Sequence, residues 1–244
     1  MSNINEILSD TDRGVGATPG ILSAMFRKIL IERNIGPAAW DRLMCRYMDD
    51  PRLEALGDTR ERSSLRSNMN SALTDNNMTI RTFLRGLAFL RPERMSFSVS
   101  LQFADDHPIP RMAGKTRVFE REVEEDISGA SGSSVLAKWY KDIDAAFSIV
   151  EEERQLLADI YCRDPRNGVS KDPDKRASTK GNLLKYFRSR TLSWINFHRC
   201  LLFLRPKTIC FDVFLTWRVT KVETRHRLQY KTYFKNTQKV KNHE

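Results

Sequence analysis

Two short runs of polar residues carry the side chains whose types and spacing could do chemistry. The first run is Thr79, Thr82 and Arg85, and the second, 114 positions later, is Ser193, Asn196 and Arg199. On one face of a helix, such groups can reach phosphates and base edges, with arginine suited to guanine and asparagine to adenine. The runs therefore predict two helices that contact nucleic acid. The alternative is that Thr79 and Ser193 only cap their helices while the arginines lie in solvent.

Both runs belong to a duplicated stretch. Residues 78–103 and 192–217 align without a gap, and the four residues Phe89-Leu90-Arg91-Pro92 recur unchanged at 203–206. Each copy has apolar residues at helical spacing, then Arg-Pro, which ends a helix, and then nine residues in which every second side chain is apolar. In the first copy these alternate with Ser96, Ser98, Ser100 and Gln102. The pattern predicts a helix followed by a strand with one buried face. A repeat of this size sets the architecture of the whole chain.

Other elements recur at the same offset. Helices are expected over 21–34, 37–48 and 64–73, and in the second copy over 135–148, 151–162 and 178–187. Second strands are expected over 116–123 and 225–234. Helix, short polar turn, helix, strand and strand is the order of a winged helix-turn-helix. The fold class we expect is α+β, a tandem duplication of a winged helix-turn-helix-like unit followed by a β-hairpin.

Composition places the domain boundaries. A chain of 244 residues is long enough for two domains. We expect a flexible arm at 1–17, a first repeat domain at 18–127, a Gly/Ser linker at 128–134, a second repeat domain at 135–237 and a basic tail at 238–244. The apolar strand faces need cover. Helices of the same copy or the sheet of the other copy could supply it.

The charge favours an anionic partner. The chain has 41 Lys and Arg against 31 Asp and Glu, a net charge of +10 and a pI near 9.6. This balance is typical of proteins that bind nucleic acid, DNA or RNA, although some soluble proteins are merely basic. The second copy carries basic residues around its hairpin, where a wing would touch phosphates, namely Arg218, Lys221, Arg225 and Arg227. An acidic run at 120–126 opposes phosphate in the first copy.

Thr82, Arg85, Asn196 and Arg199 together with these four basic residues are our candidate nucleic-acid-binding set. Asn68 and Asn182, identical residues of the third helix in each copy, could be further polar contacts, or could form an internal hydrogen bond to the following turn.

No catalytic arrangement accompanies these residues. The sequence has no phosphate-binding glycine loop and no nucleophile motif, and its histidines, at 107, 198, 226 and 243, do not recur at the offset. The four cysteines form no close pair and have no histidine at zinc-ligand spacing. We therefore expect a protein that is not an enzyme and uses no cofactor or metal.

The sequence also indicates the compartment. Its first ten residues lack the basic start and apolar run of a signal peptide, and no stretch approaches the roughly 20 apolar residues of a membrane span. Four cysteines without a disulfide pattern fit a reducing environment. We expect a cytoplasmic protein with no membrane partner.

The segment LRSNMNSALTDNNMTIRTFLRGLAFLRP and its copy resemble small helix-turn-helix-like proteins encoded by bacteriophages. The resemblance covers 60–103 and 174–217, and it implies a phage nucleic-acid-binding or regulatory protein that acts in the host cytoplasm on DNA or RNA. No functional residue follows from it. A second class stays open, a virion structural protein or adaptor that binds a host or phage protein through its duplicated surfaces. Salt separates the two classes, because phosphate binding weakens steeply with salt.

Overall fold

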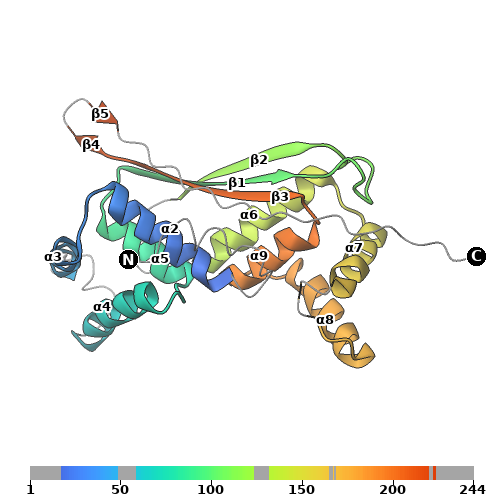
Figure 1. The fold of residues 1–244 in the computed structure, drawn as a ribbon, viewed down its shortest axis with the longest axis horizontal. Coiled ribbons are helices and arrows are strands. Elements are labelled where there is room, and N and C mark those ends of the chain that lie inside the picture. Colours follow the sequence, from blue (N-terminus) through green and yellow to red (C-terminus); the bar gives the residue numbers. More distant parts are fainter. Residues whose placement is uncertain are drawn as a thin grey trace, which may run out of the picture.

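The structure is a computed structural model that describes residues 18–48, 59–123, 132–164, 167, 169–219 and 222–223 (Figure 1). Repeat one contains α2 (Thr18–Glu32), α3 (Pro37–Met48), α4 (Thr59–Thr74), α5 (Ile80–Phe89), β1 (Arg94–Gln102) and β2 (Thr116–Val123). Repeat two contains α6 (Gly132–Phe147), α7 (Glu151–Arg163), α8 (Pro173–Tyr186), α9 (Trp194–Phe203), β3 (Thr208–Thr216), β4 (Arg218–Val219) and β5 (Val222–Glu223). The α+β class is confirmed.

Several predicted boundaries differ from the structure. The third helices were expected to begin near Ser64 and Ser178, which proved wrong, because α4 begins at Thr59 and α8 begins at Pro173 behind the cap residue Asp172. An Asp cap followed by proline is a stronger start signal than a serine inside the helix. Likewise α6 begins at Gly132, inside the segment 128–134 expected as a linker. The arm 1–17, the tail 238–244 and the expected strand 225–234 lie outside the described residues.

The central feature is one antiparallel sheet shared by both repeats, with strand order β2-β1-β3. Ser98 of β1 lies opposite Asp212 of β3, and these two residues are equivalent at the offset of 114. Met95 lies opposite Leu215, and their equivalents at the same offset, Ile209 and Leu101, also lie opposite each other. Such reciprocal pairing is the signature of a two-fold axis. A pseudo-two-fold axis therefore passes between Ser98 and Asp212 and relates the repeats.

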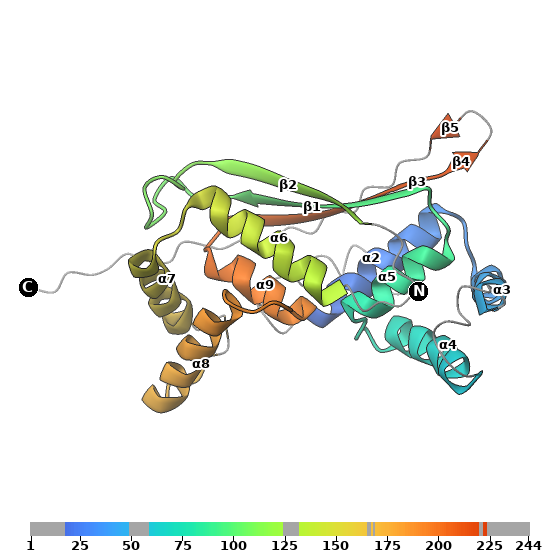
Figure 2. The same ribbon diagram turned by 180° about the vertical axis from the view of Figure 1, so that it is seen from behind.

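Four helices, α2, α5, α6 and α9, cover one face of this sheet (Figures 1 and 2). The first helix of each repeat contacts the last helix of both repeats, since α2 packs on α5 and α9 while α6 packs on α9 and α5. Aromatic contacts cross the boundary, with ring centroids 6.4 Å apart for Phe97 and Trp139 and 5.2 Å apart for Phe103 and Phe147. Helices of both repeats thus cover the strand faces, and the two repeats share one hydrophobic core.

The chain beyond each central strand packs on the opposite repeat. The indole N–H of Trp217 donates to the carbonyl of Leu90 at 2.8 Å, and the guanidinium of Arg33 lies 4.1 Å from the Trp217 ring centre. At the equivalent place in the other half, the His107 ring bonds through Nε2 to the carbonyl of Leu204 at 3.0 Å. Leu90 and Leu204 cap the C-termini of α5 and α9. Each repeat therefore holds the end of the other repeat's helix.

The turns obey the same symmetry. Arg91 and Arg205, the residues before the two equivalent prolines, both have positive φ, 47° and 55°. Asn34 and Ser148, which follow α2 and α6, also adopt this left-handed conformation, with φ of 53° and 48°. Non-glycine residues rarely adopt this region, so its recurrence at equivalent positions shows that the two repeats turn at the same points.

Candidate nucleic-acid interface

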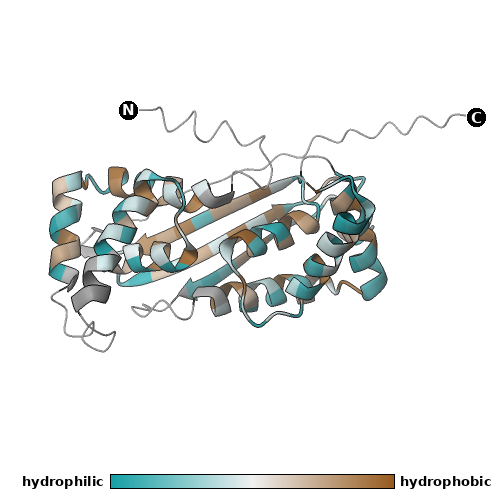
Figure 3. Ribbon diagram, turned by 90° about the horizontal axis from the view of Figure 1, so that it is seen from below, coloured by the Kyte–Doolittle hydropathy of each residue, from teal (hydrophilic) through white to brown (hydrophobic). Residues whose placement is uncertain are grey.

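The predicted reading helices α5 and α9 are central packing elements. Most of their residues are buried, and Thr82, Arg85, Asn196 and Arg199 are only half-exposed. A Cβ added to Gly86 of α5 would lie 2.7 Å from the Phe26 ring, so α5 lies tightly against α2. In the view from below, apolar strand residues lie behind the helices (Figure 3). Neither helix presents a free polar row of the kind a reading helix needs.

The polar residues at the start of these helices make intramolecular bonds. The Thr79 hydroxyl accepts from the Thr82 amide at 3.1 Å, and the Ser193 hydroxyl accepts from the Asn196 amide at 3.2 Å. The capping alternative is therefore confirmed for Thr79 and Ser193. Arg199 donates through Nη1 to the Asn196 side-chain oxygen at 3.4 Å, which draws the two predicted contacts of α9 together.

The predicted hairpin contacts are described only in part. Arg218 pairs with Glu223 through the backbone in the β4–β5 hairpin, and its side chain is not among those described. Lys221, Arg225 and Arg227 fall outside the described residues. The hairpin projects beyond the sheet at the end where α3 lies, whereas α8 lies at the other end (Figure 1). The nine residues of β3 span roughly 26 Å between these ends. Of the predicted set, the structure therefore describes the side chains of Thr82, Arg85, Asn196 and Arg199.

A basic surface that the sequence analysis missed surrounds α8. Residues 171–190 contain seven basic residues against two acidic ones, Asp172 and Asp174. Five of the basic side chains are exposed, Lys171, Lys175, Lys185, Arg188 and Arg190, and no ion pair joins them to the residues that the structure describes. We call these five residues the α8 basic surface. The local excess of basic residues over 171–190 could have predicted this surface, but the net charge of the whole chain does not reveal it.

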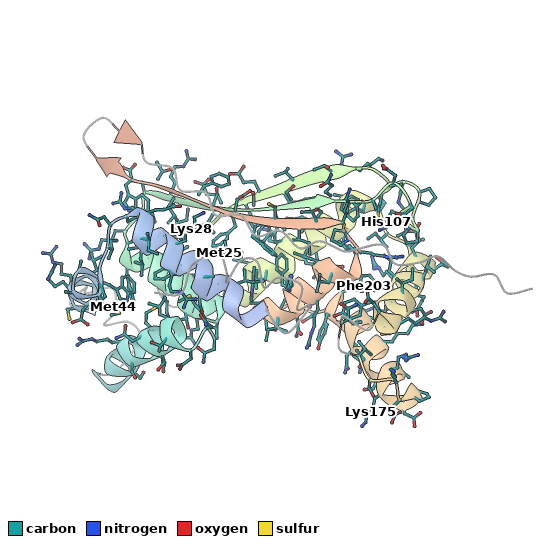
Figure 4. The ribbon with its side chains drawn as sticks, in the orientation of Figure 1. Met25, Lys28, Met44, His107, Lys175 and Phe203 are labelled. Atoms are coloured by element: carbon teal, nitrogen blue, oxygen red, sulfur yellow. The ribbon has the colours of Figure 1, made fainter. Side chains whose placement is uncertain are left out.

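The helix α8 stands away from the rest of the protein. It projects from the side of the helical layer opposite the sheet, and Lys175 lies near its free end (Figure 4). Leu183 is its only buried residue. It is attached to α7 by an ion pair in which Lys180 Nζ lies 2.7 Å from Asp159 Oδ1. An attached inner side leaves the outer side of α8 open to a partner.

That outer side carries a row of exposed polar residues, Lys175, Ser178, Asn182 and Lys185, which we call the α8 stripe. Their spacing of three, four and three places them on one helix face. On α4, the equivalent helix of repeat one, Ser64, Asn68 and Ser71 are also exposed. The repeated asparagines, for which an internal bond was the alternative, are thus both on the surface.

The sheet face on the opposite side of the molecule carries two glutamates. On this face, which none of the described helices covers, the Ser96 hydroxyl donates to Glu120 at 2.8 Å and the Arg94 guanidinium donates to Glu122 at 2.9 Å. These residues, with Phe214 and Thr216, line an open depression of about 350 Å³. Carboxylates repel phosphate. The α8 side is therefore electrostatically better suited to an anionic partner than the sheet face.

Two titratable residues of α9 are buried in the core. Burial lowers the pKa of His198 to about 4 and raises the pKa of the Cys200 thiol, so both are neutral core residues at pH 7. Within the described ranges, no three His, Cys, Asp or Glu side chains are grouped so as to hold a metal ion. None of the described helices is both long and apolar enough to cross a bilayer.

Comparison with known proteins assigns no family. No protein-family model matches this chain, and no curated protein or solved structure matches it. Function must therefore be argued from the chain's own charge and geometry.

Proposed function

We propose that this protein binds nucleic acid without catalysing a reaction on it, and that the α8 basic surface is a main phosphate contact. The single observation that carries the proposal is five exposed basic side chains gathered on and just beyond one projecting helix. Exposed lysine and arginine side chains bind phosphate by releasing counterions from the nucleic acid. The predicted residues Arg218, Lys221, Arg225 and Arg227 would add further basic charge.

The placement of acidic residues supports the same orientation. Glu120 and Glu122 lie on the sheet face, whereas Lys185, Arg188 and Arg190 follow one another on the helical side. A polyanion approaching the sheet face would meet carboxylates, and one approaching α8 would meet free cations. The similarity to phage-encoded helix-turn-helix proteins fits this proposal, and DNA and RNA are both partners it allows.

Salt dependence tests the proposal. We expect the full chain to bind a 26-base-pair DNA duplex or the matching RNA in 50 mM KCl, measured by fluorescence anisotropy. The logarithm of the affinity should fall linearly with the logarithm of salt, with a slope of roughly −4 if four or five phosphates are contacted. An absence of binding in 50 mM KCl to duplex and single-stranded probes alike would reject it.

A matched pair of charge reversals locates the surface. The double variant Arg188→Glu with Arg190→Glu should weaken binding at least about tenfold and flatten the slope by about two. The control is Lys115→Glu with Arg117→Glu, which reverses two exposed charges near the sheet and changes the net charge equally. The control should change affinity less than about threefold. Equal effects would mean that net charge alone matters, and salt-insensitive capture of a protein would favour the virion or adaptor class.

A further inference from the structure

We infer that α8 lies in the major groove of double-stranded DNA, with the α8 stripe facing the bases. This inference rests on the proposed function and adds the substrate class and the reading residues. It replaces α9, the helix that the helix-turn-helix order singles out, with the helix before it. The α8 stripe and its spacing, the attachment of α8, and the burial of α9 are independent observations that carry it.

The first step is exposure. A reading helix must offer its side chains along a whole face, because the groove walls close around it. Every member of the α8 stripe is exposed, whereas seven of the ten residues of α9 are buried. The inner side of α8 is fixed by Leu183 and by the bond from Lys180 to Asp159. The helix is therefore held firmly on one side and open on the other.

The second step is size. Ten residues separate Lys175 from Lys185, which is about 15 Å along a helix. The major groove of B-form DNA is about 12 Å wide. At this separation, one lysine can reach a phosphate on one wall of the groove and the other lysine a phosphate on the opposite wall. Ser178 and Asn182 lie between them, at the height of the base edges.

The third step is chemistry. The asparagine amide both donates and accepts, which matches the adenine edge in the major groove, and serine can bond to either strand. Gly181 adjoins Asn182, and no atom lies within 4 Å of where its Cβ would be, so the backbone there can approach the DNA closely. The acidic residues Asp172 and Asp174 lie at the N-terminal end of α8, so the phosphate contacts are strongest near Lys185, Arg188 and Arg190.

The groove also decides between DNA and RNA. In an A-form RNA duplex the major groove is deep and narrow, and side chains cannot read it. A helix with lysines at both ends and an asparagine between them fits the wider groove of DNA. Sequence preference should therefore appear on DNA duplexes and be lost on RNA duplexes of the same sequence.

Repeat one supplies a matched control inside the chain. Asn68 occupies the position on α4 that Asn182 occupies on α8, and both are exposed. On α4, however, the positions equivalent to Lys175 and Lys185 are Glu61 and Ser71. The arginines of α4, Arg60, Arg62 and Arg66, do not lie at positions equivalent to the α8 stripe, and Arg66 pairs with Asp41. We therefore expect that the face of α4 that carries Asn68 is not held in a groove.

The test starts from a random 26-base-pair duplex pool from which the full chain selects its preferred sequence. Affinities are then measured for that sequence, a scrambled duplex and the RNA duplex of the selected sequence. Asn182→Ala should lower the preference for the selected over the scrambled duplex by roughly 5- to 150-fold, the range expected for a lost two-bond base contact. Asn68→Ala should change it less than twofold. Lys175→Ala and Lys185→Ala should weaken both duplexes alike.

Three results would overturn the inference. These are salt-dependent binding from which no sequence is enriched, a sequence preference that depends on Asn196 and not on Asn182, and an RNA duplex bound as selectively as the DNA. In each of them the proposed function stands. If no nucleic acid binds at all, both the inference and the proposed function fail. Asn182 and Asn68 are exposed, so their replacement by alanine should leave the melting temperature unchanged. An unchanged melting temperature then shows that each variant is folded.

Discussion

The helices α4 and α8 hold equivalent places in the two repeats but differ in attachment and charge. The C-terminal end of α4 is bonded to α2, where the Ser23 hydroxyl donates to the Ala72 carbonyl at 3.0 Å and Arg27 donates to the Leu73 carbonyl at 2.5 Å. In contrast, α8 is attached to α7 and carries a surplus of basic residues. The duplication thus kept a shared core. The five residues of the α8 basic surface have no basic counterpart in repeat one, although α4 carries Arg60, Arg62 and Arg66 at other positions.

The two halves of the core have different residues at a few equivalent positions. At these positions, the residue of one repeat can be replaced by the residue of the other. His198 corresponds to Leu84, Cys200 to Gly86, and Trp217 to Phe103. All six residues are buried. Substitutions at these positions test whether the two halves of the core are interchangeable, and the expected effects differ in size.

The largest effect is expected at His198 in acid. Burial holds its folded-state pKa at about 4, below the unfolded value near 6.5, so the neutral ring is the stable form in the fold. Its contribution to stability is therefore complete above pH 6.5 and is lost as the pH falls from 6.5 to 4. The difference of about 2.5 pKa units corresponds to about 3 kcal/mol. Urea unfolding of wild type and His198→Leu at pH 7, 5.5 and 4 should show this amount as acid sensitivity that the variant lacks.

The reverse exchange is the control for this comparison. Leu84→His places a histidine at the equivalent buried position of repeat one and should introduce a similar loss in acid. If wild type and His198→Leu lost stability in parallel between pH 7 and pH 4, the histidine would be shown not to govern acid sensitivity.

Two glycines should respond to alanine in opposite directions. Gly86→Ala forces a methyl group to within 2.7 Å of Phe26, whose ring is fully buried, and should cost about 2 kcal/mol despite the helical preference of alanine. Gly181→Ala on α8 meets no neighbour within 4 Å and should stabilise by about 0.5–1 kcal/mol. Thermal melts of the two variants measure both. A stabilised Gly86→Ala would mean that α5 and α2 are less closely packed than the structure has them.

The smallest destabilisation is expected from loss of the two hydrogen bonds that hold the helix ends. Trp217→Phe, which imports the residue of repeat one, removes the bond to the Leu90 carbonyl and weakens the contact with Arg33, and should cost about 1–1.5 kcal/mol. His107→Leu should cost a similar amount through the Leu204 carbonyl. Since the two bonds lie at opposite ends of the sheet, the double variant should be additive within about 0.5 kcal/mol. If the losses in free energy of unfolding measured in urea were strongly non-additive, the two hydrogen bonds would not be independent.

Local sequence patterns predicted most of the described elements, although not the starts of α4 and α8 or the short strands β4 and β5. The strand expected over 116–123 is β2, and the helix expected over 151–162 is α7 with one further residue. Apolar periodicity reports which side of an element is buried, and Arg-Pro ends α5 and α9 because proline disfavours helical geometry in the residue before it. The 114-residue offset then transferred each assignment from one repeat to the other.

The pairing between repeats could not be predicted in the same way. The apolar faces of β1 and β3 would be covered equally well by several partners, and only packing of the whole chain decides that Ser98 faces Asp212. The same reason explains the candidate site. The polar row of α9 looked available, but the fold half-buries Asn196 and Arg199. The sequence of α8 does not reveal that its polar row is exposed. The fold does, because Leu183 is the only residue of α8 that is buried.

The shared sheet sets the timing of folding during synthesis. The partner of β1 is β3, 114 residues further along the chain, so at a synthesis rate of 5–20 residues per second roughly 6–23 s separate their appearance. Until β3 has been synthesised, the backbone groups along one edge of β1 lack the strand with which they pair in the folded protein. Because the pairing around Ser98 and Asp212 is reciprocal, β1 of a neighbouring nascent chain could occupy that edge in the same register, and two growing chains on one message would compete with correct folding.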